Sequence, residues 1–564
     1  MRSFWLAILL LLSTFAICAQ TQAPLTPSDD FQISGILVDS RDGQPIPGAR
    51  VSVAAGSARK EPATMITGED GRFVFPGLAA DRYDLTALRR GYIRQSFDQH
   101  GGFSTAIVTG PGLDSTNLVF RLTAECSITG TITDEAGEAV RDAEVSLYQL
   151  ATGAKNLRES TLPARITNGE GFYSFTHLRP GKYAVSVSAK VWYAQRPQAK
   201  EETTLVAQSR RMGWSYSSGS LAAGDYDDSQ GQSPLDVAYP PTFYPGVTEP
   251  QTLPVINLHV GEKFVANIAL QPVAALHIHV DAAQADAVRN STFVRLQRQA
   301  LDGTGSIVSA ETRFSKSGSM DIVGIPAGHY SIEMANGDNN QASPHYLLDA
   351  ATSGPSAIQN SSNGLVSASV QAPPGGRTGS TMYLRLYCYN TGENLVEAVP
   401  EDGEVRFKKR ASPGEYEISL GNSDQDRPLF IKTITAVGAK SVGRAVRIQE
   451  GTPVHLKVAV DKGTGQLTGR AIRKEKPVAG AMIALVPIVP EHNLVLIRRG
   501  QTNSDGSFII TGIVPGKYTI VSLEHGWDLD VWDLSVLKQY LGSGKSLDVE
   551  PNGKYQTEIN LDGQ

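Results

Sequence analysis

A short unit recurs five times along this 564-residue chain, and the repeat constrains the fold more strongly than any other feature of the sequence. Each copy has a glycine that is followed 12 or 13 residues later by a tyrosine. Apolar side chains stand two and four residues after each glycine, so both lie on one face of a strand. The glycine–tyrosine pairs are Gly71 and Tyr83, Gly171 and Tyr183, Gly318 and Tyr330, Gly403 and Tyr416, and Gly506 and Tyr518.

Further blocks complete each unit. A second turn, usually Pro-Gly as in Pro515-Gly516, leads into an alternating strand that contains the tyrosine. Upstream, three copies share a strand–turn–strand block with Gly35, Gly130 or Gly469, and four copies end in one more apolar strand. Several short alternating strands without a helical period predict a β-sandwich, and a unit of roughly 100 residues can bury its own core.

The repeat therefore predicts an all-β chain that consists of a tandem array of about five β-sandwich modules. The third and fourth modules are assigned from the spacing alone, because their copies of the unit are degenerate. The expected modules span residues 31–122, 123–271 with a long loop insertion at 195–255, 272–372, 378–461 and 464–562.

The first, second and last modules resemble the carboxypeptidase regulatory-like domain. The resemblance rests on segments such as ISGILVDSRDGQPIPGARVSV, ITNGEGFYSFTHLRPGKYAVSV and QTNSDGSFIITGIVPGKYTIVSL. It implies Ig-like or transthyretin-like sandwiches, related in fold to the B-type repeats of collagen adhesins. In the family these domains are non-catalytic accessory or interaction modules, often of bacterial envelope proteins, so the resemblance implies no peptidase.

The N-terminus has the pattern of a signal peptide. Arg2 precedes an apolar run from Phe4 to Ile17, which is too short to span a bilayer comfortably. We expect a signal peptide at residues 1–19 with cleavage after Ala19; a retained anchor and lipid attachment at Cys18 are the alternatives. The mature chain is expected to lack a transmembrane segment and to lie outside the cytoplasm: in the periplasm, on the outer cell surface or secreted.

Charge and cysteine content narrow the possible partners. The net charge is −6 with no long basic run, so the sequence predicts no nucleic-acid partner. Cys126 and Cys388 fall in different expected modules, and we expect both to be buried free thiols.

The sequence offers few groups that could perform catalysis or hold a metal. His259 and Glu262 have the spacing of zinc-carboxypeptidase ligands but no matching third ligand, and Gly544-Lys545-Ser546 lacks the earlier glycine of a phosphate-binding loop. His277, His279 and Asp281 alternate along one strand, which suits either a divalent metal or a solvated strand face. We therefore expect no enzyme activity, no cofactor and no assigned metal site.

Two irregular segments are candidates for binding. Tyr239, Phe243 and Tyr244 stand among prolines in the insertion of the second module; they could stack on sugars, anchor a protein partner or pack against the sandwich. In the last module, Trp527, Trp532 and Tyr540 dominate an insertion that predicts a short helix at 533–540 covering the sandwich edge.

The function most consistent with these patterns is that of a secreted, non-catalytic structural or adhesive protein of the cell envelope that displays loops from tandem sandwiches. The alternative is a carbohydrate-binding protein that uses exposed aromatic loops. The expected partners are envelope proteins or glycans.

Overall fold

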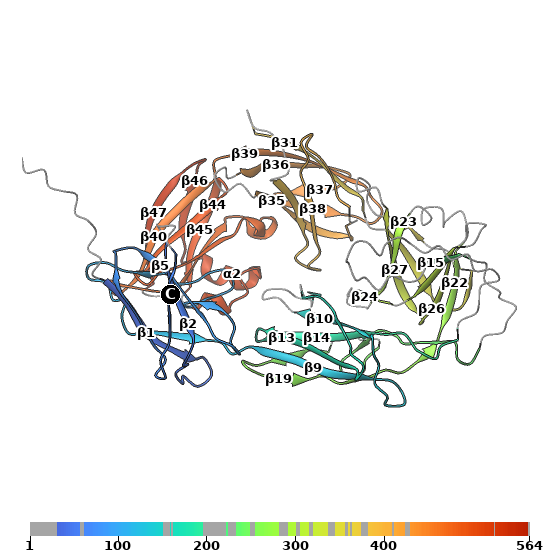
Figure 1. Cartoon of the computed structure of the whole chain (residues 1–564). Coiled ribbons are helices and arrows are strands. Elements are labelled where there is room, and N and C mark those ends of the chain that lie inside the picture. Colours follow the sequence, from blue (N-terminus) through green and yellow to red (C-terminus); the bar gives the residue numbers. More distant parts are fainter. Residues whose placement is uncertain are drawn as a thin grey trace, which may run out of the picture.

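A computed structural model of the chain consists almost entirely of β-strands arranged in successive pairs of sheets (Figure 1). The structure describes residues 31–56, 61–149, 158–159, 162–195, 221–223, 233–248, 254–280, 291–299, 305–308, 310–314, 320–336, 345–355, 359–360, 364–373, 382–408, 411–422, 429–523 and 525–561. The expected signal peptide and part of the 195–255 insertion lie outside the described residues.

The first module is a sandwich of a three-stranded sheet, β4-β1-β8, and a five-stranded sheet, β3-β2-β5-β6 with β7 on β5. Alternate residues of the strands point into one core, as Phe73 and Phe75 do from β4. Its strands are β1 (Phe31–Asp39), β2 (Arg50–Ala55), β3 (Ala63–Ile66), β4 (Arg72–Leu78), β5 (Arg82–Leu88), β6 (Gln95–Ser96), β7 (Ile107–Val108) and β8 (Leu118–Leu122).

The second module repeats this plan, with sheets β13-β9-β19 (plus β20) and β11-β10-β14-β17 (plus β12 and β18) around a second core. Its strands are β9 (Cys126–Thr133), β10 (Glu144–Gln149), β11 (Arg158–Glu159), β12 (Arg165–Ile166), β13 (Phe172–Leu178), β14 (Gly181–Ser188), β17 (Thr242–Phe243), β18 (Ile256–Leu258), β19 (Lys263–Val265) and β20 (Ile268–Ala269). From the insertion, β16 (Val237–Ala238) pairs with β21 (Val273–Ala274).

The third module has two five-stranded sheets, β15-β25-β26-β22-β29 and β24-β23-β27-β28-β30. One edge strand, β15 (Leu221–Ala223), comes from the insertion of the second module and pairs in parallel with β25. The remaining strands are β22 (Leu276–Val280), β23 (Ser291–Gln299), β24 (Gly305–Ile307), β25 (Glu311–Phe314), β26 (Met320–Ile325), β27 (Gly328–Asn336), β28 (His345–Ala350), β29 (Gly354–Pro355) and β30 (Gln359–Asn360).

The fourth module has sheets β34-β31-β39-β36 and β33-β32-β35-β38-β37. Its first strand is β31 (Val366–Gln371), so the expected boundary at residue 372 is wrong: β31 pairs with β34 and β39 and contributes Val366, Ala368 and Val370 to the fourth core. The other strands are β32 (Met382–Tyr387), β33 (Asn394–Ala398), β34 (Glu404–Arg406), β35 (Gly414–Asn422), β36 (Leu429–Val437), β37 (Lys440–Val442), β38 (Ala445–Ile448) and β39 (Val454–Lys462).

The last module has sheets β41-β40-β44 (plus β47) and β43-β42-β45-β46. The elements are β40 (Gly465–Arg473), β41 (Lys476–Pro477), β42 (Met482–Pro487), η2 (Pro490–His492), η3 (Leu494–Leu496), β43 (Arg498–Gln501), β44 (Ser507–Ile513), β45 (Gly516–Leu523), η4 (Gly526–Asp528), α2 (Leu534–Leu541), β46 (Lys545–Val549) and β47 (Lys554–Asn560).

The predicted helix of the last module is confirmed as α2, where the Asp533 carboxylate accepts a hydrogen bond from the Ser535 amide and caps the first turn. The helix covers a sheet face, however, and not the expected edge. Its Leu537 packs with Met482 and Val521, which point away from the sandwich core, whereas neighbouring residues of β42 and β45 point into it. Strand β42 is therefore buried on both faces, which explains its continuous apolar sequence.

The repeated tyrosines occupy equivalent places in all five modules. Each is at most 6% exposed, and each hydroxyl donates a hydrogen bond to the carbonyl four residues earlier, across the turn that precedes its strand. Each of these hydrogen bonds gives a partner to a buried hydroxyl and to a turn carbonyl, and a buried polar group without a partner would be costly. The acceptors are Ala79, Arg179, Pro326, Ser412 and Val514.

Four modules close in the same way, with their last long strand pairing in parallel with their first. The pairs are β1 with β8, β9 with β19 and β20, β31 with β39, and β40 with β47. Gly35, Gly130 and Gly469 lie where the closing strand passes closest: a Cβ on Gly130 would lie 2.1 Å from the Ala266 carbonyl oxygen. A close backbone approach therefore explains why the upstream block contains a glycine.

We expect Gly130→Ala to destabilise the second module by about 1–3 kcal/mol, because the added methyl group would force β9 away from its closing strand. Hydrogen exchange of peptides from β9 and β13 measures this loss. Gly169→Ala is the matched control, since no atom lies within 4 Å of its Cβ position. Equal protection in both variants would contradict the proposed close approach.

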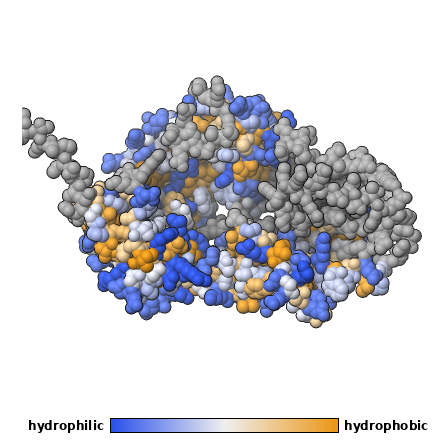
Figure 2. Space-filling model, in the orientation of Figure 1, coloured by the Kyte–Doolittle hydropathy of each residue, from blue (hydrophilic) through white to orange (hydrophobic). Residues whose placement is uncertain are grey.

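The five sandwiches follow one another around a closed loop, so that the first module (blue) lies beside the last (orange to red) in Figure 1. Contacts between residues about 400 positions apart support this closure, for example from Gln501 to Asp98 and Thr105. Figure 2 shows hydrophobic residues in small groups among hydrophilic ones over the first two modules on the visible face. In the described part of the chain, no helix is long and apolar enough to cross a membrane.

Candidate functional site: the closure interface and the module joints

The contact between the first and last modules, here called the closure interface, has a polar half. The Val108 amide donates a hydrogen bond to Ser504 Oγ (2.8 Å), and the Ser504 amide donates one to the Ala106 carbonyl (2.9 Å). Gln501 Nε2 donates to the Asp98 carbonyl (2.7 Å) and to Thr105 Oγ1 (2.8 Å). Gln501 and Thr105 are buried, so these bonds are shielded from water and specify one docking position.

The other half of the closure interface is aromatic. The indole of Trp527 stacks on His100 with ring centroids 5.2 Å apart, and it also contacts Phe103 at 5.1 Å. The Arg499 guanidinium lies over Phe103, Trp527 and Trp532 at 5.4–5.8 Å. Trp527 Nε1 donates a hydrogen bond to the Gly480 carbonyl, which holds the indole in place. These side chains are half-buried, and aromatic and arginine residues dominate the stability of many interfaces.

We expect Trp527→Ala to weaken the closure by about 2 kcal/mol or more, because the indole contacts both His100 and Phe103. Spin labels on Val74→Cys and Ile509→Cys, two exposed positions of the first and last modules, measure their separation. The distance distribution is expected to be narrow in the parent chain and broad in the variant. Trp192→Ala, at a 79% exposed position, is the control, and a distribution that Trp527→Ala leaves narrow would refute the closure.

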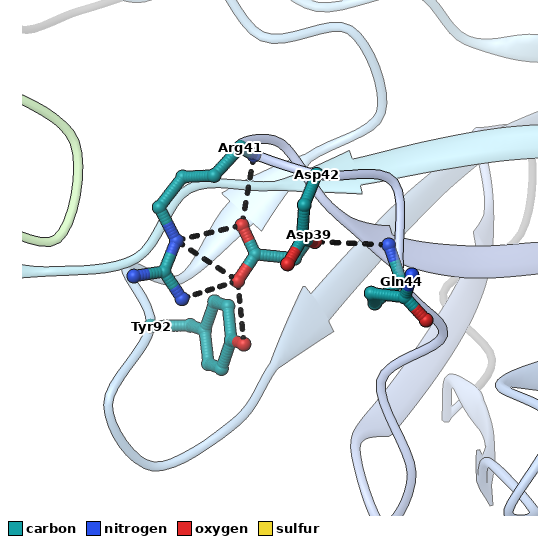
Figure 3. A network of polar contacts seen from close by, with 5 residues as sticks. All are labelled: Asp39, Arg41, Asp42, Gln44 and Tyr92. Carbon is teal, nitrogen blue, oxygen red and sulfur yellow. Dashed lines mark hydrogen bonds and ion pairs between the residues drawn. The ribbon is translucent and has the colours of Figure 1, made fainter.

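A charged network of the first module lies beside the joint with the second module (Figure 3). Asp39 accepts hydrogen bonds from Arg41 Nη2 at 2.6 Å and from the Tyr92 hydroxyl at 2.9 Å. The Arg41 hydrogen bonds lower the pKa of Asp39 to about 2. The Arg41 guanidinium also reaches the second module, where a Cβ on Gly261 would lie 2.8 Å from Nη1. The network therefore lies directly beside the second sandwich.

A second buried carboxylate lies at the joint between the fourth and last modules. Glu417 on β35 is 4% exposed and accepts hydrogen bonds from the Leu494 and Val495 amides of η3 at 3.0 and 2.6 Å. Burial raises the pKa of Glu417 to about 7 despite these two hydrogen bonds. Beside it, His492 Nδ1 lies 3.0 Å from Glu415 Oε1.

The aromatic residues predicted for binding lie against the second sandwich. Tyr239 and Phe243 are 4% and 2% exposed, and Tyr244 is half-buried beside Phe264. The Tyr239 hydroxyl donates a hydrogen bond to Glu135 Oε2 at 2.8 Å. This placement corresponds to the packed alternative. Ligand binding through these three side chains stays a prediction, and it would require the segment to leave the core.

The histidine strand differs from a solvated face. His277 is 7% exposed and pairs with the buried Asp236 of the insertion, which ties the second module to the third, while the half-exposed His279 lies 2.6 Å from Asp321. Ile278 and Val280 point into the core, so His277 lies on the opposite face, where Asp236 covers it and a wet face is the wrong expectation. Asp281 lies outside the described residues.

Other candidate residues have simple structural roles. Exposed His259 pairs with Glu262 at 3.0 Å in a turn, and Lys545 and Ser546 lie in β46. Among the described residues, no three His, Cys, Asp or Glu side chains form a group that could hold a metal. Cys126 and Cys388 are confirmed as buried free thiols.

The closure residues of the first module were missed by the sequence analysis. The loop QSFDQHGGFSTA contains His100 and Phe103 and interrupts an otherwise strand-rich module, which is the only local signal of a special role. Trp527 was recognised as unusual but assigned to the cover of its own module. Sequence alone could not show that the two segments meet, because the contact joins residues about 400 positions apart.

Comparison with solved structures finds bacterial proteins, among them a pilin and a collagen-binding protein, at low similarity. The TIE protein of Bacillus anthracis is 10% identical with a TM-score of 0.16, covering 94% of this chain and 74% of that chain. The minor pilin GBS52 of Streptococcus agalactiae is 10% identical with a TM-score of 0.19 (43% and 96% covered). Two B-repeat units of the collagen-binding protein of Staphylococcus aureus are 11% identical with a TM-score of 0.12 (77% and 99% covered). At such TM-scores the similarity supports no conclusion, and the fold assignment rests on the strands and cores described above.

Sequence comparison is more specific. A search of curated proteins finds no match to the chain. The family model of the carboxypeptidase regulatory-like domain matches residues 32–123 and 127–210, which correspond to the first module and the start of the second. The match confirms the resemblance seen in the repeated segments: two N-terminal segments of this chain match the carboxypeptidase regulatory-like domain.

Proposed function

We propose that the chain is a non-catalytic structural or adhesive protein of the cell envelope, located outside the cytoplasm. In this proposal its sandwiches hold loops in fixed relative positions, where they bind envelope proteins. The match of the N-terminal segments to the carboxypeptidase regulatory-like domain, a non-catalytic accessory or interaction module, supports this role. The apolar N-terminal segment supports export.

The observation that carries the proposal is the set of contacts that fix one module against another. Arg41 lies against Gly261 at the first joint, Glu417 bridges the joint between the fourth and last modules, and Gln501 with Trp527 joins the two ends of the array. Rigid joints reduce the conformational entropy that a multi-module binder loses when several loops contact a partner together. Such preorganisation favours a binding or scaffolding role.

Localisation and crosslinking test the proposal together. The full-length chain, produced in a bacterium, is expected in the periplasm or on the surface without residues 1–19. A photo-crosslinking amino acid at exposed positions of several modules should then capture the same envelope proteins repeatedly, and Trp527→Ala should reduce capture. Recovery in the cytoplasm, or capture of abundant proteins equally by an unfolded chain, would reject the proposal.

Carbohydrate binding is the second candidate, and one exposed aromatic side chain favours it. Trp192 is 79% exposed at the end of the second sandwich and lies 5.5 Å from the Tyr193 ring, so it could stack on a sugar face. Retention on immobilised polysaccharides should fall in Trp192→Ala if sugars bind there. A decrease only in the Tyr239, Phe243 and Tyr244 triple alanine variant would place sugar binding in the packed segment.

A further inference from the structure

A cavity lies at the joint between the fourth and last modules. It has a volume of about 250 Å³ and is bounded by β35 and β36 on one side and by η3 and the turn after β44 on the other. Its wall contains two arginines, Arg444 and Arg498, together with several apolar side chains. The apolar part includes Leu420, Leu429, Leu496 and Val514.

The two guanidinium groups lack an anionic partner in the described part of the chain. Arg444 is 8% exposed, and its Nη2 donates a hydrogen bond to the Ile431 carbonyl. Arg498 donates from Nε to the Gly512 carbonyl and from Nη1 to the Val495 and Ile497 carbonyls. All of these acceptors are neutral, and a guanidinium has five N–H donors, so each arginine keeps donors that no described protein group accepts.

Glu417 is the carboxylate that could serve as a counter-ion for these arginines, but it already accepts other hydrogen bonds. Glu417 accepts the Leu494 and Val495 amides and forms no ion pair with either arginine among the described residues. Its raised pKa also means that at neutral pH a large fraction of Glu417 carries no charge. Burial lowers the pKa of both Arg444 and Arg498, and the attraction between Arg444 and Glu417 does not outweigh this effect. A bound anion would offset this cost.

We propose that this joint cavity binds a small carboxylate that has an apolar body. The carboxylate accepts hydrogen bonds from the free N–H groups of Arg444 and Arg498, and the apolar body contacts Leu420, Leu429, Leu496 and Val514. Arginine pairs suit carboxylates because their planar N–H groups match the two oxygens. The volume lies below the roughly 300–1,000 Å³ of sites for drug-sized ligands, so the occupant is small. The C-terminal residue of a peptide and a free aliphatic acid share this chemistry.

Calorimetry on the mature chain tests the proposal with matched probes. N-acetyl-leucine represents a peptide C-terminus and hexanoate represents a free acid, while N-acetyl-leucinamide and hexanamide are their uncharged counterparts. We expect the acids to bind and the amides to bind at least about tenfold more weakly. Tighter binding of N-acetyl-leucine would indicate a peptide C-terminus as the natural ligand, and tighter binding of hexanoate would indicate a free aliphatic acid. Equal binding of acid and amide, no binding of either acid, or binding of inorganic phosphate alone would overturn the proposal.

Substitutions locate the site. Arg444→Gln is expected to reduce acid affinity about 10- to 100-fold, as for loss of a charge-assisted hydrogen bond. Arg447→Gln is the matched control, because Arg447 lies on β38, three residues after Arg444, but is exposed. Circular dichroism shows whether both variants are folded. If Arg444→Gln does not fold, the comparison of acid with amide in the parent chain still tests the proposal. An unchanged acid affinity in folded Arg444→Gln would refute the assigned site.

Discussion

Replacement of Tyr518 by alanine is expected to lower the stability of the last module by about 3–5 kcal/mol. The side chain is 1% exposed, lies in the centre of the core, and donates a hydrogen bond to the Val514 carbonyl at 2.7 Å. The alanine variant creates a cavity and leaves the turn carbonyl without its donor. Hydrogen exchange of peptides from β44 and β45 in the full mature chain measures the loss locally, which is needed because a multi-module chain does not unfold in one step.

Two further variants separate the causes of this effect. Tyr518→Phe keeps the ring and removes the hydroxyl, so it should cost about 1 kcal/mol. Ile509→Ala, at a position of β44 that is 45% exposed, should change stability by less than about 0.5 kcal/mol. If Tyr518→Ala and Ile509→Ala had equal effects, the tyrosine would not be the core anchor that its position indicates. The equivalent Tyr183→Ala should destabilise the second module similarly.

The joint between the fourth and last modules is expected to lose about 3 kcal/mol of stability as the pH rises from about 4.5 to above 7. The pKa of Glu417 is raised from 4.5 to about 7, so the folded chain binds this proton more tightly than the unfolded chain. The stabilisation is therefore complete below the unfolded pKa and is lost as the pH rises through the folded pKa. Urea denaturation, followed by fluorescence of Trp527 and Trp532 across this range, measures the change.

Glu417→Gln should abolish most of this pH dependence, because the amide stays neutral and its oxygen can still accept one of the two η3 amides. Glu404→Gln, on an exposed position of β34, is the control and should retain the full dependence of the free energy of unfolding on pH. The Glu415–His492 pair lies nearby, and Glu415→Gln separates its contribution. If the free energy of unfolding depended on pH equally in the parent chain and in Glu417→Gln, Glu417 would not be the source of that dependence.

Much of the fold could be predicted because the information was local and repeated. The glycine turn, the inward pair such as Phe73 and Phe75, and the tyrosine all lie within about 13 residues of one another, and backbone sterics and strand periodicity act over that range. The fourth module shows the limit. Its first strand, VSASVQ, alternates correctly but lacks the glycine of the stronger copies, so its assignment to a module required the observed pairing with β39.

Side-chain positions at the joints could not be predicted, because they depend on contacts between modules. His277 alternates with Ile278 in a way that suggests a half-solvated strand, but Asp236 from the insertion covers it. Likewise, the sequence around Arg444 and Arg498 has nothing unusual. Their importance arises only when the fourth and last modules meet and enclose both guanidinium groups.

The parallel pairing of first and closing strands has a mechanical consequence. Since β1 and β8, or β40 and β47, run in the same direction, the chain enters a sandwich at one end and leaves it at the opposite end. Tension along the polypeptide would pull the two neighbouring strands in opposite directions along their length. Their row of hydrogen bonds would then bear the load together instead of separating one after another, and a pulled chain should release its closure interface long before any single sandwich ruptures.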